Sequence, residues 1–277
     1  MAGLPYLKRQ NQTVKLIMNI IVPIDFSVIS LNAARFAANM LKGQYEATLV
    51  LYHVYDDAKK ENEAKMDLRK LKDSLLDENI VKIEYIAEEG SDFIDCLERK
   101  VRHLDASLVV MAITDKSKLE QVFTGSNSLR MIERSLCPVL VIPEEAKFNQ
   151  ITNVALASDF KDVQTTIPIV PVKKILSLFQ PNLHIVNINS EIYVSLNEEY
   201  LEQRRLMLEM FKDFRPEFYF ITTFDFHDTL RQFINDKNID MVLTFPRSHS
   251  FINNLIKGNN TKKLVFESSI PVLAAHE

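Results

Sequence analysis

Aspartate follows the first strongly apolar stretch in each half of the sequence, as Asp25 and as Asp159. A carboxylate at the end of a buried strand can accept a hydrogen bond from a ribose hydroxyl or an adenine amino group. A second candidate is Gly125–Asn127, which leads into a predicted helix. The first N–H groups of a helix and its dipole attract anions such as phosphate. These residues predict ligand binding, and a turn or capping role for Asp25 is the competing interpretation.

The residues that usually make or break bonds are not arranged for catalysis. The six histidines show no H-E-x-x-H spacing, so no metal centre is expected, and His53 is interpreted as structural. Cys96 and Cys137 are too few for a disulfide framework, and a buried, inert thiol is expected at Cys137. With five glycines in the chain, neither a dinucleotide fingerprint nor a P-loop can be written. No G-x-S-x-G elbow is present either, so we expect a protein that is not an enzyme.

Two halves of the sequence repeat each other. The pattern D-F-x-D-x-L at Asp92 recurs 133 residues later at Asp225, and S-x-x-P-V-L at Ser135 recurs at Ser268. Nearer the start the offset is 134, as between Asp25 and Asp159. A unit this long is a whole domain, because solenoid repeats run about 20–50 residues.

Apolar stretches alternate with amphipathic ones, which predicts strands alternating with helices and a parallel sheet in each half. In the first half we expect strands at 16–24, 48–54, 81–87, 108–113 and 139–142, and helices from about 30, at 57–79, 92–103 and 126–135. In the second half we expect strands at 154–157, 183–188, 218–222, 241–245 and 272–275, and helices ending at 179, at 194–214, 225–236 and 261–267. Ser27 or Ser30 should cap the first helix, and Ser91 the third. The fold class is therefore α/β, with two tandem doubly wound domains.

The expected domain bounds are an N-terminal arm at 1–15, a first domain at 16–143, a polar linker at 144–151 and a second domain at 152–277. A net charge of −4 gives no reason to expect binding to nucleic acid or to an anionic membrane. No apolar run approaches the roughly 18 residues that span a bilayer, and the first residues contain no signal-peptide core. These features predict a cytoplasmic protein.

The strand ends resemble those of the universal stress protein (UspA-like) family. The residues that carry the resemblance are Pro23–Ser27, Leu51–Val54, Leu108–Ala112, Gly125-Ser126 and Cys137–Val141. It covers 16–143 well and 151–275 more weakly. It implies a five-stranded parallel sheet of order 3-2-1-4-5 in each half, with helices on both faces. It also implies pairing through the last strands, which here would give an intramolecular pseudo-dimer, and a homodimer could form as well.

One branch of this family binds ATP or a related nucleotide through G-x-x-G-x9-G-[ST] after the fourth strand, and another branch lacks that motif. Ligands of doubly wound sheets lie where the strand order reverses, here between strands one and four. The candidate binding residues are accordingly Asp25, Val54, Ala112, Gly125, Ser126 and Asn127.

The motif is altered in both halves. In the first, Ala112 and Asp115 stand where the family has glycine. The Asp115 carboxylate would cost about 4 kcal/mol against a phosphate charge roughly 4 Å away at an effective dielectric near 20. In the second half, Phe245 and Ser248 take the same places, and Lys161 replaces the serine after the strand-one aspartate. We expect Phe245 to be buried, a weakened site in the first domain and a degenerate second domain.

Two functions remain open. One is a stress-response protein that binds or senses an adenine nucleotide, with at most one weakened site. It would need no cofactor, although ATP, ADP or AMP could bind in the first domain, with Mg²⁺ only alongside the nucleotide. The alternative is a ligand-free pseudo-dimeric scaffold with an unidentified protein partner. A nucleotide-hydrolysing enzyme is a distant third, because no pyrophosphate loop is present.

Overall fold

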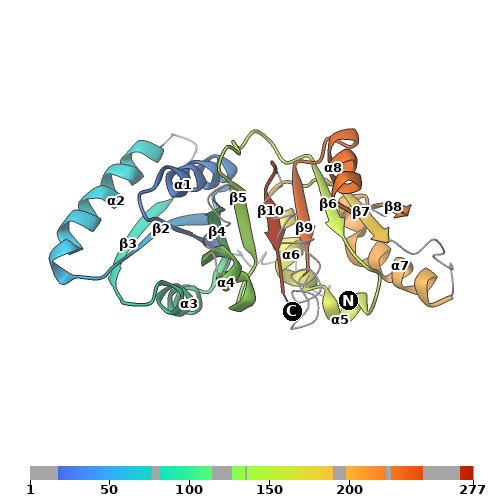
Figure 1. The fold of residues 1–277 in the computed structure, drawn as a ribbon, viewed down its shortest axis with the longest axis horizontal. Helices are drawn as coiled ribbons and strands as arrows, with labels where there is room; N and C mark the ends of the chain where they lie inside the picture. The colour runs from blue at the N-terminus through green and yellow to red at the C-terminus, as the bar shows by residue number, and fades with distance from the viewer. Residues whose placement is uncertain are drawn as a thin grey trace, which may run out of the picture.

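All ten strands that the structure describes join one continuous sheet. In this computed structural model the described residues are 18–76, 82–113, 127–134, 136–189, 198–222, 226–245 and 269–276. The strands are β1 Met18–Pro23, β2 Ala47–Tyr55, β3 Ile83–Glu89, β4 Ala106–Ile113, β5 Val139–Pro143, β6 Asn153–Ala157, β7 Asn182–Asn189, β8 Glu217–Thr222, β9 Met241–Thr244 and β10 Val272–Ala274. Their order across the sheet is β3-β2-β1-β4-β5-β10-β9-β6-β7-β8, which Figure 1 shows from one end of the molecule to the other.

The order 3-2-1-4-5 is present in each half. Strands β1 to β5 follow it from one edge of the sheet to the middle, and β6 to β10 follow it from the other edge. Neighbouring strands within a half are parallel, as their alternation with helices requires. The predicted α/β fold class is confirmed.

The two halves meet through their last strands. β5 and β10 pair antiparallel, with Leu140 opposite Leu273 and Val141 opposite Val272. These four side chains are buried, so each short apolar strand protects the other from being a free edge. The predicted central pairing is therefore confirmed, and it relates the halves by a pseudo-two-fold axis.

Helices cover both faces of the sheet (Figure 1). They are α1 Val28–Met40, α2 Glu61–Leu75, α3 Phe93–His103, α4 Asn127–Arg134, α5 Val163–Thr166, α6 Ile169–Leu176, α7 Glu198–Phe211 and α8 Phe226–Asp236. One hydrophobic cluster lies beneath α1, α2, α6 and α7, and a second lies beneath α3, α4 and α8. Alternate residues of each central strand enter opposite clusters, as a sheet buried on both faces requires.

Local sequence accounts for most helix ends, with two corrections. The Ser27 side chain caps α1 by accepting from the Ser30 N–H, one of the two predicted options. At α3 the prediction of Ser91 was wrong, because the Asp92 carboxylate accepts from the N–H groups of Ile94 and Asp95. The amphipathic helix expected to reach residue 79 ends at Leu75, after a 3-10 turn at Ala58–Lys60.

The helix expected to run to residue 179 is interrupted. It forms two helices, α5 and α6, separated by Ile167 in an extended conformation and by Pro168. A residue before proline avoids helical angles, and proline has no N–H for the helical ladder. The predicted helix at 261–267 lies outside the described residues.

Residues 144–152 connect the halves without forming a helix or strand. The Asn32 amide donates to the carbonyls of Glu144 and Ala146, at 3.0 and 2.9 Å, which holds this linker against α1. The ring of Phe148 packs edge-on against Phe36, with centroids 5.3 Å apart. Among the described helices, none is both long enough and apolar enough to cross a membrane.

Candidate functional site

Three strands of the first half end at one edge of the sheet. Pro23 of β1 lies opposite Tyr52 of β2, and the Ile24 N–H continues the ladder by donating to the Tyr52 carbonyl at 2.7 Å. On its other side β1 pairs with β4, with Ile21 opposite Val109. This register places Asp25, Val54 and Ala112 at the same edge, next to the reversal of strand order between β1 and β4.

Asp25 closes a tight turn just beyond β1. Its Oδ1 accepts from the Ser27 N–H at 2.9 Å and from the Ser27 hydroxyl at 2.5 Å. Burial of the carboxylate raises its pKa, but hydrogen bonds from Ser27 and Ser30 outweigh that effect and hold the Asp25 pKa below its ordinary value. The carboxylate is therefore ionised at neutral pH, with Oδ1 committed to the turn.

The turn is strained in the same way in both halves. Phe26 and Phe160, which follow Asp25 and Asp159, have φ of 63° and 57° in the left-handed region. Asp159 Oδ1 accepts from the Lys161 N–H at 3.1 Å, as Asp25 does from Ser27. Left-handed angles at a bulky residue cost about 1–2 kcal/mol and persist only where the surroundings enforce them. The turn interpretation of the aspartates is thus correct for one carboxylate oxygen.

His53 of β2 contacts the residues on both sides of Asp25. Its Nδ1 lies 2.6 Å from the Ile24 carbonyl, which makes this nitrogen the N–H donor. Its ring packs against Phe26, with centroids 4.9 Å apart. The prediction of a structural role for His53 is confirmed.

Helix α4 begins at the same edge. The Ser128 hydroxyl donates to the Ala112 carbonyl at 3.0 Å, which ties the first turn of the helix to the end of β4. Asn127 is exposed at the helix start. Val54 packs on the cluster beneath α3 and α4, so it shares a face with this helix. Gly125, Ser126 and Asp115 lie outside the described residues.

The corresponding edge of the second half is filled by aromatic rings. Phe160 is 3% exposed and packs against Tyr200 of α7 and against Phe218 and Phe220 of β8, with centroids 5.1, 6.0 and 5.4 Å away. Phe245, the counterpart of Ala112, is 7% exposed and belongs, like Phe160, to the hydrophobic cluster beneath α1, α2, α6 and α7. The predicted burial of Phe245 is confirmed.

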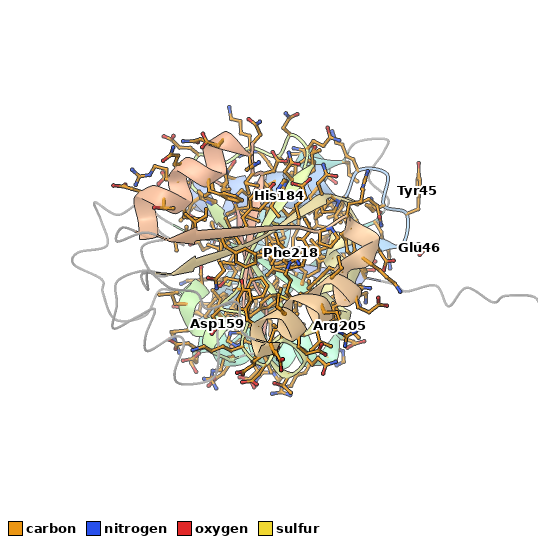
Figure 2. The ribbon with its side chains drawn as sticks, turned by 90° about the vertical axis from the view of Figure 1, so that its right-hand side faces the viewer. Tyr45, Glu46, Asp159, His184, Arg205 and Phe218 are labelled. Carbon is orange, nitrogen blue, oxygen red and sulfur yellow. The ribbon has the colours of Figure 1, made fainter. Side chains whose placement is uncertain are left out.

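A polar cluster elsewhere in the second half was not foreseen. Buried His184 lies 3.3 Å from the Tyr219 hydroxyl and 3.4 Å from Asn153 Oδ1. Burial lowers its pKa against the attraction of Glu217, so His184 is neutral at pH 7. Figure 2 shows His184 well separated from Asp159, so the two do not form one site. In the described part of the chain, no group of three His, Cys, Asp or Glu side chains could hold a metal ion.

A repeated asparagine was also missed. Asn19 donates to the Leu104 carbonyl at 2.6 Å, and Asn153 donates to the Asn238 carbonyl at 3.3 Å. The first bond joins the start of β1 to the turn before β4, and the second joins the start of β6 to the turn before β9. The recurrence of asparagine 134 residues apart was the available signal.

Comparison with known proteins agrees with this geometry. Residues 17–143 match the universal stress protein family. A universal stress protein of Methanocaldococcus jannaschii is 31% identical in an alignment of 148 residues that covers 46% of this chain and 83% of that protein.

Solved structures extend the likeness of fold to nearly the whole chain. A universal stress protein from Archaeoglobus fulgidus superimposes with a TM-score of 0.67 at 15% identity, over 94% of this chain and 96% of the other. A protein of unknown function from Pseudomonas aeruginosa gives 0.62 at 12% identity, over 94% and 93%. The strand order, the repeated turn after the first strand and the sequence match lead to one conclusion: the chain belongs to the universal stress protein family.

Proposed function

We propose that the first half binds an adenine nucleoside or nucleotide at the edge formed by β1, β2, β4 and the start of α4, in a stress-response role. The hydrogen bond from Ser128 to the Ala112 carbonyl carries this proposal, because it fixes a helix N-terminus at the reversal of strand order. The strained turn at Phe26 supports it, since such strain concentrates at functional sites.

Each candidate residue has a distinct part in this proposal. Asp25 Oδ2 would accept from a ribose hydroxyl or the adenine amino group, because Oδ1 is held by Ser27. Val54 would contact the apolar face of the base. The segment Gly125–Asn127 would offer N–H groups to a phosphate. Asp115, thirteen residues before Ser128 in the sequence, would repel a polyphosphate, so we propose weak binding, at tens of micromolar or above.

Calorimetric titration with adenosine, AMP, ADP and ATP, with and without Mg²⁺, tests this function. Asp115→Gly should tighten ATP by about tenfold or more and leave adenosine almost unchanged, because only the phosphates sense that charge. Glu63→Gln, on the exposed face of α2, is the matched control for net charge and should change neither affinity. Equal effects of Asp115→Gly on ATP and adenosine would contradict the charge argument.

A ligand-free scaffold is the second candidate. The observation that favours it is that Asp25 and Asp159 accept the same hydrogen bond in the turn of each half. In the second half aromatic rings pack beside this turn, so the aspartate is used there as a structural residue. Asp25→Asn should weaken adenosine and ATP alike if Asp25 contacts the nucleoside. Absence of saturable binding by all four adenine compounds at millimolar concentration would favour the scaffold instead.

A further inference from the structure

A cavity of about 570 Å³ lies between the two halves, away from the proposed nucleotide edge. The first half contributes Asp105–Ser107 at the start of β4 and Leu136–Pro138 before β5. The second half contributes Thr165, Ile167–Pro171, Lys174 and His276, which follows β10. Cavities of about 300–1,000 Å³ at domain interfaces are typical small-molecule sites.

The pseudo-two-fold axis explains why the two sides differ here. The position that this axis relates to the cavity lies beside α1 and the end of β5. There the linker covers α1 and is held by Asn32 and Phe36. His276 is the counterpart of Pro143, the residue from which that linker departs. Under the same symmetry the linker corresponds to the stretch that leads into β1, which lies outside the described residues. Among described residues, nothing covers the α6 side as the linker covers α1, and Val170 there is 76% exposed.

The cavity wall is mostly apolar, and Lys174 is the cation among its described residues. Pro168, Ile169 and Pro171 supply an apolar surface from α6 and the residue before it. Lys174 is half-buried, and its Nζ donates to the Ser107 hydroxyl at 2.8 Å. Within the described ranges no carboxylate lies at ion-pair distance from Lys174. Asp105 also lines the cavity but is exposed to solvent, which weakens its influence.

Two further groups restrict what the cavity can take. The Nε2 atom of His276 is buried and has no hydrogen-bond partner in the described structure, so a ligand atom could satisfy it. Burial lowers the pKa of His276 to about 4, and it raises the pKa of the Cys137 thiol to about 12. Both are therefore neutral at pH 7, and Lys174 is the cation that faces the apolar wall.

We propose that this cavity binds a small amphiphilic monocarboxylate, with its carboxylate on Lys174 and Ser107 and its apolar body against Pro168–Pro171. The site is independent of the proposed nucleotide edge and goes beyond that function. A single carboxylate suits one ammonium and one hydroxyl, whereas a polyanion would leave charges unpaired beside Asp105.

The test compares octanoate with octan-1-ol, which have the same chain with and without the charge, by calorimetric titration of the full chain. Octanoate should bind about ten- to a hundredfold more tightly than octanol, as expected for a hydrogen bond to a partly buried charge. Lys174→Met should remove this preference while retaining octanol binding. Lys173→Met is the matched control, because Lys173 is the neighbouring lysine and pairs with Asp213 at 2.8 Å; it should keep the preference.

Three results would overturn the proposal. The first is equal binding of octanoate and octanol by the unaltered chain. The second is an octanoate preference that survives Lys174→Met. The third is the absence of saturable binding of either compound, which is the result expected if another part of the chain fills the cavity.

Discussion

At Gly90 the chain leaves no room for a β-carbon. A Cβ built there would overlap the Cys96 sulfur and would stand 3.3 Å from Val54 Cγ1. Gly90→Ala should therefore lower the free energy of unfolding by about 1–3 kcal/mol, the usual cost of overpacking. Denaturant titration measures this change.

The double variant Gly90→Ala with Cys96→Ala isolates the cause. Removing the sulfur creates space for the new methyl group, so Gly90→Ala should cost much less in this background than in the native one. An equal cost in both backgrounds would contradict the steric explanation and point to the backbone instead.

His276 makes stability depend on pH. Its pKa is lowered to about 4 in the folded protein by burial, against about 6.5 for an unperturbed histidine. Between these values the unfolded chain binds the additional proton, so stability is fully present above pH 6.5 and is lost as the pH falls towards 4. Because the ring is partly solvated, we expect a loss of about 1–3 kcal/mol rather than the full value.

Thermal unfolding from pH 7.5 to 4 checks this dependence. His276→Gln should flatten the curve between pH 6.5 and 4 relative to the unaltered chain. His103→Gln, at an exposed position on α3, is the control for loss of an imidazole and should alter the curve less than His276→Gln does. A curve that His276→Gln does not alter would assign the pH dependence to other groups.

Between β3 and α3, one carboxylate ties a strand to a helix. Glu88 accepts from the hydroxyl of Tyr52 at 3.1 Å, from Arg99 at 2.6 Å and from Lys100 at 2.8 Å. Tyr52 is fully buried, and Glu88 is the hydroxyl's partner in the described structure. Glu88→Ala should cost about 1–3 kcal/mol of unfolding free energy, because it leaves a buried hydroxyl unsatisfied.

Tyr52→Phe supplies the control for this element. In that background no buried hydroxyl can lose its partner, so Glu88→Ala should lower the free energy of unfolding by less. A double-mutant cycle measured by denaturant titration gives the difference. Additive costs would show that Glu88 acts through Arg99 and Lys100 alone.

Which elements could be predicted depended on whether the decisive contact was local. The buried face of α2, with Ala64, Leu68, Leu71 and Leu75, follows the helical spacing of its apolar residues. The sequence does not separate Ser91 from Asp92 as the cap of α3, because both residues can cap and only the backbone angles decide between them. The break at Pro168 follows from the sequence, because proline has no N–H for the helical ladder.

The candidate site was predictable in part. The position of Asp25 after a buried strand places it at the sheet edge, and the structure adds that one oxygen is used by the turn. The cavity beside Lys174 could not be read from sequence, because its walls come from both halves and exist only once β5 meets β10. The roles of Asp25, Val54, Ala112, Gly125, Ser126 and Asn127 in ligand binding stay predictions, as do the domain bounds.

For the molecule as a whole, the central pair of strands should make the two halves unfold together. Leu273 is fully buried and lies opposite Leu140 across the pairing. Leu273→Ala should cost about 2–5 kcal/mol. Hydrogen exchange should show reduced protection of amides in β4 and β5 as well as in β9 and β10, because a lost contact at the centre weakens both halves of the sheet.

Leu183→Ala is the comparison for this variant. It removes an equally buried leucine from β7, away from the pairing. It should lower protection in the second half more than in the first. A Leu273→Ala variant that leaves β4 and β5 fully protected would show that the halves unfold independently.

The antiparallel meeting of β5 and β10 also bears on how this chain could change over evolutionary time. Because the strands of the two halves run in opposite directions, the carboxyl edges that carry Asp25 and Asp159 face away from each other. After a duplication, one copy could therefore accumulate substitutions at its edge, such as Phe245 where the first half has Ala112, without disturbing the other. Selection for folding acts on the shared central strands, and selection for a ligand acts on each edge separately. A chain built in this way can retain an old activity in one half while the other is free to drift or to acquire a different role.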